Sequence, residues 1–525
     1  MNKAKIKKSL KNVELFHSGE MVLKYNLETL NIKNGIDWEY MHPTNHSTYQ
    51  VYLHSLPIVN DFVIVGTQTR RKNELETARN LIQEWFSNGI STEYAWHEHA
   101  VSSRLLNIIK FQEEAEDFKL GTSFFQELLI KHCLFLNDDD NYKHNNHGLM
   151  MDNALIAASF YIEDTTVKNS YINKALFRIR TSIYRDLTRQ GLHVENSPEY
   201  HNLYITLLNQ IFQTLKKYDI KLESNIDYLK DSAIKLRASL LKPNHEFPMI
   251  GDTGQSKYKN IIKSFDDIVD LDAGLIVLQN ENKRKKILSR YFTFKCGYIS
   301  KTHKHLDDLS ITYYNNGHDV IIDPGKYSYN KDSYREYIVS PQAHSTVTIA
   351  NGSYLLHQVG QSIRSKLGVT KYFYTDDYHL IEGINHLYEE AEIKRTCIIT
   401  RADDLIIIDR VVKNNESDVL QIFNINENAE IIKKHNGFEI NIENFTYTLE
   451  YIGQIENLRL DIFDGIISKE FGKKIQNKRA CFTYNSSETY SVIMLKDKRS
   501  TTEIKSLDNT QLIIEMLEEL ISIPL

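Results

Sequence analysis

The stretch QNENKRKKILSRYFTFKCGYIS (residues 279–300) marks the point at which the apolar residues of this chain change their spacing. Before it, apolar residues recur every three to four positions, as in ELETARNLIQEWFSNG (74–89), which ends at the helix-stopping Gly89. After it they alternate, as they do in strands with one buried face. The sequence therefore predicts a helical domain followed by a β domain.

The helical part holds a series of amphipathic segments of similar length with short connections. We expect helices at 74–89, 97–115, 123–136, 148–163, 169–189, 198–218 and 226–241. Such hairpins close into a bundle, a solenoid or a toroid, and the lack of a visible sequence repeat disfavours a TPR-type array. A mixed prelude (1–70) completes the predicted helical domain, residues 1–280.

Residues 281–525 form the predicted β domain, with many short alternating segments separated by turn signals such as Asn-Gly. Strands in antiparallel order predict a β-sandwich or stacked sheets. The basic run KRKK (283–286) is more typical of a solvated linker than of a binding patch. The expected architecture is an α-helical toroid followed by a β-sandwich.

Composition excludes several classes of protein. Lys and Arg number 63 against 69 Asp and Glu, a net charge of −6, which argues against a nucleic-acid-coating polycation. The four cysteines lie far apart without a CxxC pair, which argues against a disulfide framework or a cysteine zinc site. With no apolar run of membrane length and no apolar signal-peptide core, we expect a cytoplasmic protein with no membrane partner, or a periplasmic or secreted one if a signal was removed.

The first polar segment is HNNHGLMMDNALIAASFY (144–161), in which Asn145, Asn146 and His147 precede an amphipathic helix. Asparagine commonly caps a helix, and this is the simpler interpretation. A helix N-terminus also favours anions, so an amide and an imidazole there could neutralise a carboxylate.

The second is GLHVENSPEYHNLYITLLNQIF (191–212), which places Tyr200 and Tyr204 on one helix face beside His201. Tyrosines at this spacing most often form a half-buried aromatic stripe. The alternative is a phenol that transfers a proton in a cleft, with Glu195 as a further polar side chain nearby.

The third segment is KTHKHLDDLSITYYNNGHDVIIDPGKYSYN (301–330), followed by His344. His303 and His305 are two positions apart, so on a strand both would point to the same face. Two histidines and the carboxylate of Asp323 are ligand types that zinc accepts. The histidine pair alone would be no better evidence for a metal site than for a solvent-exposed hairpin.

Together these segments resemble the heparinase II/III-like polysaccharide lyases. The matching pieces occur in the family's order across 144–347: NNHG, SPEYH, PMIGDTG, THKHLDD, DVIIDPGKYSY and AHSTV. The resemblance implies an incomplete (α/α) toroid packed on an antiparallel β-sandwich, with an acidic polysaccharide bound between them and cleaved by β-elimination at a uronic acid. The AHSTV piece has Ser345 where the family often has Asn, and a second catalytic tyrosine cannot be aligned.

The resemblance also implies roles for single residues. Asn146 and His147 match residues that contact the substrate carboxylate, while Tyr200 and His303 match catalytic residues. A structural zinc ion would be held by His305, Asp323 and His344. We further expect substrate contacts from four residues of these segments: Glu195, His201, Tyr204 and Arg335. A homodimer is compatible with the sequence.

Two other functions stay open at this stage. A sugar-binding or exopolysaccharide-assembly protein could keep the fold without catalysis. A toroid glycoside hydrolase would need two carboxylates across a cleft, and Glu195, Glu199 and Asp252 are available. Because Arg335 is the only arginine near the third segment, we expect a uronate polymer with little or no sulfate, although Arg104, Arg178, Arg180 and Arg364 could add charge.

Overall fold

The computed structural model describes residues 3–525 except 26, 358–360, 454–456 and 509. The chain divides into two compact units, and the division runs through three helices. Unit 1 comprises residues 1–185 and 206–226, and unit 2 comprises residues 186–205 and 227–525.

The helices form in the part of the chain where apolar residues have helical spacing. Their bounds are α1 (Lys3–His17), α2 (His46–His54), α3 (Pro57–Gln68), α4 (Asn73–Asn88), α5 (Glu98–Glu114), α6 (Thr122–Asn137), α7 (Asn146–Ser159), α8 (Thr165–Asp186), α9 (Pro198–Lys217) and α10 (Ser224–Leu240). The seven predicted helices are confirmed as α4 to α10, with ends within a few residues. The prelude contributes α1 to α3 and a small hairpin of β1 (Glu20–Met21) and β2 (Leu30–Asn31).

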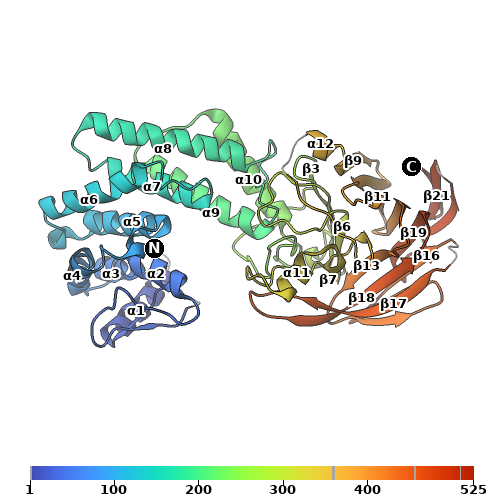
Figure 1. Ribbon diagram of the computed structural model, residues 1–525, viewed down its shortest axis with the longest axis horizontal. Coiled ribbons are helices and arrows are strands. Elements are labelled where there is room, and N and C mark those ends of the chain that lie inside the picture. The colour runs from blue at the N-terminus through green and yellow to red at the C-terminus, as the bar shows by residue number, and fades with distance from the viewer. Residues whose placement is uncertain (1–2, 26, 358–360, 454–456, 509) are drawn as a thin grey trace. The chain divides into compact units, whose positions relative to one another are not determined.

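In unit 1, much of the helix packing is between helices two places apart in the sequence, as for α1 with α3, α3 with α5, and α5 with α7 (Figure 1). α7 is almost wholly buried, and its apolar residues Leu149, Leu155 and Ile156 are fully inaccessible to solvent. A helix that is apolar on every side must be covered all round, which makes α7 a central element of this unit.

Unit 2 contains two large antiparallel sheets. The larger sheet has the strand order β17-β18-β13-β7-β6-β5-β4-β3, and β8 also pairs with β13. Its strands are β3 (Ile268–Asp270), β4 (Leu275–Asn280), β5 (Arg290–Lys295), β6 (Ser310–Asn315), β7 (His318–Ile321), β8 (Val347–Ile349), β13 (Val419–Ile425), β17 (Arg459–Ile467) and β18 (Ile475–Tyr484). The second has the order β14-β15-β16-β19-β12-β11-β10-β9: β9 (Leu367–Tyr374), β10 (Tyr378–Asn385), β11 (Ala391–Thr400), β12 (Leu405–Lys413), β14 (Glu430–Lys433), β15 (Gly437–Ile442), β16 (Phe445–Ile452) and β19 (Glu488–Asp497). Two short helices, α11 (Ser333–Val339) and α12 (Gln361–Arg364), lie in the connections.

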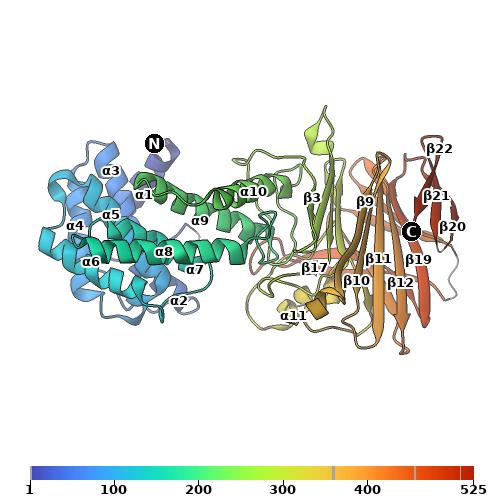
Figure 2. The same ribbon diagram turned by 90° about the horizontal axis from the view of Figure 1, so that it is seen from above.

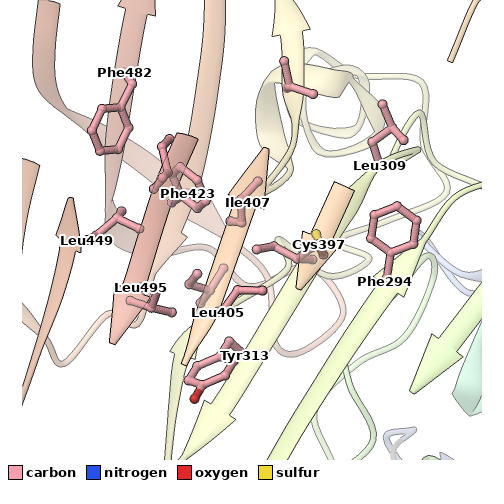
Figure 3. Close-up of a cluster of buried hydrophobic side chains, with 14 of the residues drawn as sticks. Phe294, Leu309, Tyr313, Cys397, Leu405, Ile407, Phe423, Leu449, Phe482 and Leu495 are labelled. Carbon is pink, nitrogen blue, oxygen red and sulfur yellow. The ribbon is translucent and has the colours of Figure 1, made fainter. Parts of the chain in front are cut away.

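The two sheets enclose one apolar core, to which both contribute alternate residues. Phe294 and Tyr313 of the larger sheet lie among Cys397, Ile407 and other residues of the second sheet (Figure 3). A third sheet of β20 (Glu503–Leu507), β21 (Gln511–Met516) and β22 (Glu519–Pro524) covers the other face of the second sheet (Figure 2). The unit is therefore a sandwich with an additional layer.

The predicted fold class, an incomplete (α/α) toroid followed by an antiparallel β-sandwich, is confirmed. The start of the strands differs from the prediction, because β3 and β4 precede residue 281 and the charged run follows β4 as a connection to β5. Their apolar residues are continuous rather than alternating, since β4 is buried on both faces. None of the helices in the described part of the chain is long and apolar enough to cross a membrane.

Candidate active site

One carboxylate, that of Asp252, joins the predicted site residues of unit 2. Its Oδ2 lies 2.9 Å from His303 Nδ1, and its Oδ1 lies 3.0 Å from His305 Nε2. The guanidinium of Arg335 donates to both oxygens, at 2.5 and 3.1 Å. Asp252 is 1% exposed, so these four contacts hold a buried anion.

The local structure that carries the two histidines differs from the strand that their spacing suggested. They lie in a turn before β6, where His303 has a left-handed backbone (φ 57°), rather than on a strand. The intervening Lys304 is buried and its ammonium binds the carbonyl of His305 (2.8 Å) and the carboxylate of Asp308 (3.1 Å). This ion pairing, rather than strand alternation, fixes the loop.

Gly251 allows three segments to converge here. It has a φ of 55°, and a Cβ at this position would lie 2.5 Å from the carbonyl oxygen of Asn196 and 2.6 Å from that of His303. Both neighbours are backbone atoms, which cannot rotate away. Glycine is therefore required where the PMIGDTG segment passes the other two.

The charge state of Asp252 sets the tautomers of both histidines. Burial acts to raise the pKa of Asp252, but the hydrogen bonds from His303, His305 and Arg335 outweigh it and hold the pKa well below its usual value. An ionised carboxylate only accepts hydrogen bonds, so His303 Nδ1 and His305 Nε2 must each carry the proton. His303 Nε2 and His305 Nδ1 are then the nitrogens with lone pairs when the rings are neutral.

Tyr200, near the start of α9, lies directly against His303. The ring centroids are 3.6 Å apart and the planes differ by 20°. The Tyr200 hydroxyl is 2.8 Å from that of Tyr329. Burial raises the pKa of Tyr200, and burial together with the hydrogen bond to Tyr200 raises that of Tyr329, so both phenols are protonated near neutral pH.

Two further carboxylates surround this pair. Glu195 Oε2 is 3.5 Å from His303 Nε2. Glu199 accepts from the Gly254 backbone at 2.7 Å and binds the ammonium of Lys326 through both oxygens at 2.9 Å. A glycosidase acid needs a protonated carboxyl, whereas Asp252 is ionised and Glu199 is in an ion pair, so neither of these two suits the acid of the hydrolase alternative.

The structure contradicts substrate contact by His201 and Tyr204, which are each 1% exposed. The His201 ring accepts from the backbone of His193 (3.1 Å) and donates to the carbonyl of Ala233 (2.9 Å), and burial lowers its pKa to about 4. The ring of Tyr204 stacks on that of His193 at 4.4 Å. Both residues support the protein interior behind Tyr200.

The predicted metal ligands form a compact buried cluster. His305, Asp323 and His344 each offer one ligand atom, and these atoms lie within 4.8 Å of one another. His305 Nδ1 and His344 Nε2 are buried and have no hydrogen-bond partner among the residues that the structure describes. His305 Nδ1 is also the nitrogen that Asp252 leaves unprotonated, so the donor set fits a divalent metal ion with Asp252 as its outer partner.

In unit 1, Asn146 and His147 lie in the first turn of α7. Asn145 caps this helix by accepting from the His147 backbone at 2.8 Å, which confirms the expected capping role for one asparagine of the motif. The His147 side chain binds Glu98 of α5, with Nδ1 and Oε1 2.8 Å apart. Burial acts to raise the pKa of Glu98, but the His147 hydrogen bond, a backbone hydrogen bond and the nearby imidazoles of His97 and His147 together bring the pKa down to about 2.

The sequence prediction missed the roles of Asp252, Tyr329, Lys326 and Glu98. The first three stand in the quoted motif pieces PMIGDTG and DVIIDPGKYSY, so the signal was present, but nothing in the spacing shows that these segments meet. Arg335 was expected to bind substrate, and the structure instead engages its guanidinium with Asp252 and the Lys326 carbonyl.

We expect Asp252→Asn to lower turnover about 10- to 100-fold, as is typical when the partner that orients a functional histidine is lost. The free energy of unfolding should fall by about 1–3 kcal/mol because Arg335 loses its buried counter-ion. Initial rates and urea unfolding would measure both effects, with the exposed Asp231→Asn as the control. Unchanged turnover in a folded Asp252→Asn protein would contradict this role.

Family profiles match the chain over nearly its full length. The heparinase II/III N-terminus matches residues 2–272, and the heparinase II/III-like C-terminal domain matches residues 270–507. None of the curated proteins is similar enough in sequence to match.

Solved structures share the fold at low sequence identity. The heparan sulfate lyase HepC from Pedobacter heparinus is 14% identical, with a TM-score of 0.78 over 99% of this chain and 89% of that chain. A structure of heparinase III is also 14% identical, with a TM-score of 0.78 over 100% of this chain and 91% of that chain. The chain therefore belongs to the heparinase II/III-like family, and its enzyme class is that of the polysaccharide lyases.

Proposed function

We propose that the protein cleaves a uronate-containing polysaccharide by β-elimination and leaves a 4,5-unsaturated uronate at the new chain end. One observation carries this proposal: a phenol and an imidazole in face-to-face contact, Tyr200 and His303, with the imidazole held by an ionised carboxylate. Such a pair can remove one proton and deliver another in the same reaction.

The chemistry requires both groups. The C5 proton of a uronate is weakly acidic because its carboxylate resists the second negative charge of the enediolate. In our proposal Asn146 and His147 stabilise that charge, a contribution of several kcal/mol in comparable oxyanion sites. Their roles rest on the family motif.

The geometry supports a division of labour between the two proton carriers. His303 keeps its Nδ1 proton on Asp252, so Nε2 is the atom that can accept the C5 proton. Tyr200 is a neutral phenol with its hydroxyl next to that of Tyr329, which suits donation to the departing O4. The Tyr329 hydroxyl can hydrogen-bond to the Tyr200 phenolate, and the proton that His303 has taken from C5 can pass through water to Tyr200, which restores both groups.

We propose that the metal cluster binds zinc and has a structural role. His305, Asp323 and His344 would hold the ion, and it would supply a positive charge that joins three segments of the sandwich. His303 stands two residues from His305, so the ion would fix the loop that carries the proton acceptor.

The substrate in this proposal is an acidic polysaccharide with little or no sulfate. The cationic side chains of Arg335 and Lys326 already bind carboxylates of the protein. A densely sulfated chain would need cations that are available to it. The relatives named heparan sulfate lyase and heparinase III make glycosaminoglycan-type uronates the first polymers to test.

The test is to incubate the protein with unsulfated and sulfated uronate polymers and to follow ultraviolet absorbance and reducing ends. A lyase produces both signals, a hydrolase only reducing ends, and a binding protein neither. We expect the unsulfated member of each pair to be cleaved faster. Faster cleavage of the sulfated member, with a rate that falls steeply with salt, would overturn the assignment of low sulfation.

We expect Asn146→Ala and His147→Ala to lower kcat more than they raise KM, because their partner is the charge that develops in the transition state. Steady-state kinetics on the best polymer of the panel would measure the two constants. Glu98→Gln should show a smaller effect of the same kind, since it acts through His147. An effect confined to KM would reassign Asn146 and His147 to ground-state binding.

A further inference from the structure

An exposed group of aromatic side chains adjoins Tyr200 within unit 2. It consists of Phe471 in the turn between β17 and β18 together with Tyr327, Tyr329 and Tyr334. The rings of Phe471 and Tyr329 have centroids 5.7 Å apart, and those of Tyr327 and Tyr334 are 5.9 Å apart. We call these four residues the aromatic shelf.

The shelf is held by main-chain hydrogen bonds between two segments that are distant in sequence. The Gly472 amide donates to the Tyr327 carbonyl, and the Ser468 amide donates to the Pro324 carbonyl, both at 2.7 Å. Figure 1 shows the β17–β18 hairpin reaching the region of α11. A turn fixed in this way presents its side chain in one position, which lowers the entropy cost of binding.

Three of the four rings are exposed, and Tyr327 is half-buried. Phe471 is 57% exposed, Tyr329 51% and Tyr334 38%. Single exposed apolar residues are common, but neighbouring exposed aromatic rings around polar groups mark binding surfaces. The flat faces of such rings can stack on the apolar faces of pyranose sugars. Binding sites for small ligands are commonly lined by aromatic side chains.

The shelf is continuous with the proton-transfer pair. Tyr329 belongs to both, because its hydroxyl contacts Tyr200 and its ring lies beside Phe471. A sugar on Phe471 would therefore lie beyond the sugar that reacts at Tyr200, along the same chain.

The charge next to the shelf matches an acidic sugar. Lys474 is exposed, and its ammonium lies 5.2 Å from the ring centroid of Tyr327 and also over the ring of Tyr334. This cation interacts with two rings of the shelf and is exposed, so a carboxylate of a bound sugar can reach it. The shelf thus combines a stacking surface with a positive charge.

We propose that the aromatic shelf is a subsite that stacks a pyranose ring of the substrate next to the reacting uronate, with Phe471 as its main contact and Lys474 as the partner of that sugar's carboxylate. This inference rests on the proposed function. It predicts that affinity rises with oligosaccharide length up to the length that reaches Phe471.

The experiment measures binding without turnover. Oligosaccharides of increasing length from the best polymer of the panel are titrated calorimetrically into Tyr200→Phe protein, with and without Phe471→Ala. Losing one aromatic stacking partner should weaken binding of the longer oligosaccharides about tenfold and leave the shortest unchanged. Phe471→Trp should restore affinity, whereas Lys474→Ala should weaken binding and reduce its salt dependence.

The matched control is Phe463→Ala, because Phe463 lies on β17 with 45% exposure and faces Arg479 across the strand pair rather than the shelf. Equal affinities with and without the Phe471 ring would overturn the subsite and leave the lyase proposal intact. Failure of every uronate oligosaccharide to bind, together with no cleavage in the absorbance assay, would overturn both proposals.

Discussion

Tyr200→Phe should abolish most of the turnover, with a loss of about 100- to 10,000-fold, while the protein stays folded. The substitution removes one hydroxyl, and general acid–base catalysis by a positioned side chain is typically worth this much. The stacking on His303 is retained, because phenylalanine has the same ring. Initial rates by ultraviolet absorbance, together with circular dichroism, would measure both parts of the expectation.

Tyr329→Phe is the informative comparison, since it removes the hydroxyl 2.8 Å from that of Tyr200 and leaves Tyr200 itself intact. We expect a smaller loss than for Tyr200→Phe, because Tyr329 acts through Tyr200. Near-normal activity of a folded Tyr200→Phe protein would remove Tyr200 from the mechanism.

Removal of the metal should destabilise unit 2. A ligand present at 100 times its Kd stabilises the folded state by about 2.7 kcal/mol, which for a unit of this size corresponds to about 4 °C in Tm. Elemental analysis of the purified protein and thermal unfolding with and without a chelator would test this. Re-addition of zinc should restore the Tm.

His344→Ala should remove both the bound metal and the chelator-dependent change in Tm. The exposed His435→Ala should change neither, as it lies outside the cluster. Stoichiometric metal in the His344→Ala protein, or a wild-type Tm that ignores the chelator, would end the proposal of a zinc site.

The helices and most strands could be predicted because their apolar spacing is a local property. The segment from 74 to 89, for example, has one apolar face and ends at glycine, and the structure forms α4 over Asn73–Asn88. The motif pieces could also be placed in order, which identified the candidate histidines and Tyr200.

The arrangement of the site could not be predicted in the same way. Alternation suggested that His303 and His305 lie on a strand, but the buried ammonium of Lys304 turns the loop instead. The helical spacing places Tyr200 and Tyr204 on one face but does not show how deeply each side chain is buried. Tyr204, one turn after Tyr200, lies in the protein interior. Asp252 could be read only as one more carboxylate, because its partners come from segments about 50 and 80 residues away.

The third sheet, β20 to β22, determines how the protein should respond to truncation at its C-terminal end. Leu512, Ile514 and Ile523 cover apolar side chains such as Leu380 and Ile406 on the second sheet. A chain shortened before β20 would present this apolar surface to water and to other copies of itself, and large exposed apolar patches favour aggregation. Loss of soluble protein from such a truncation would show that the exposed apolar surface aggregates. It would not show that the C-terminal residues take part in catalysis.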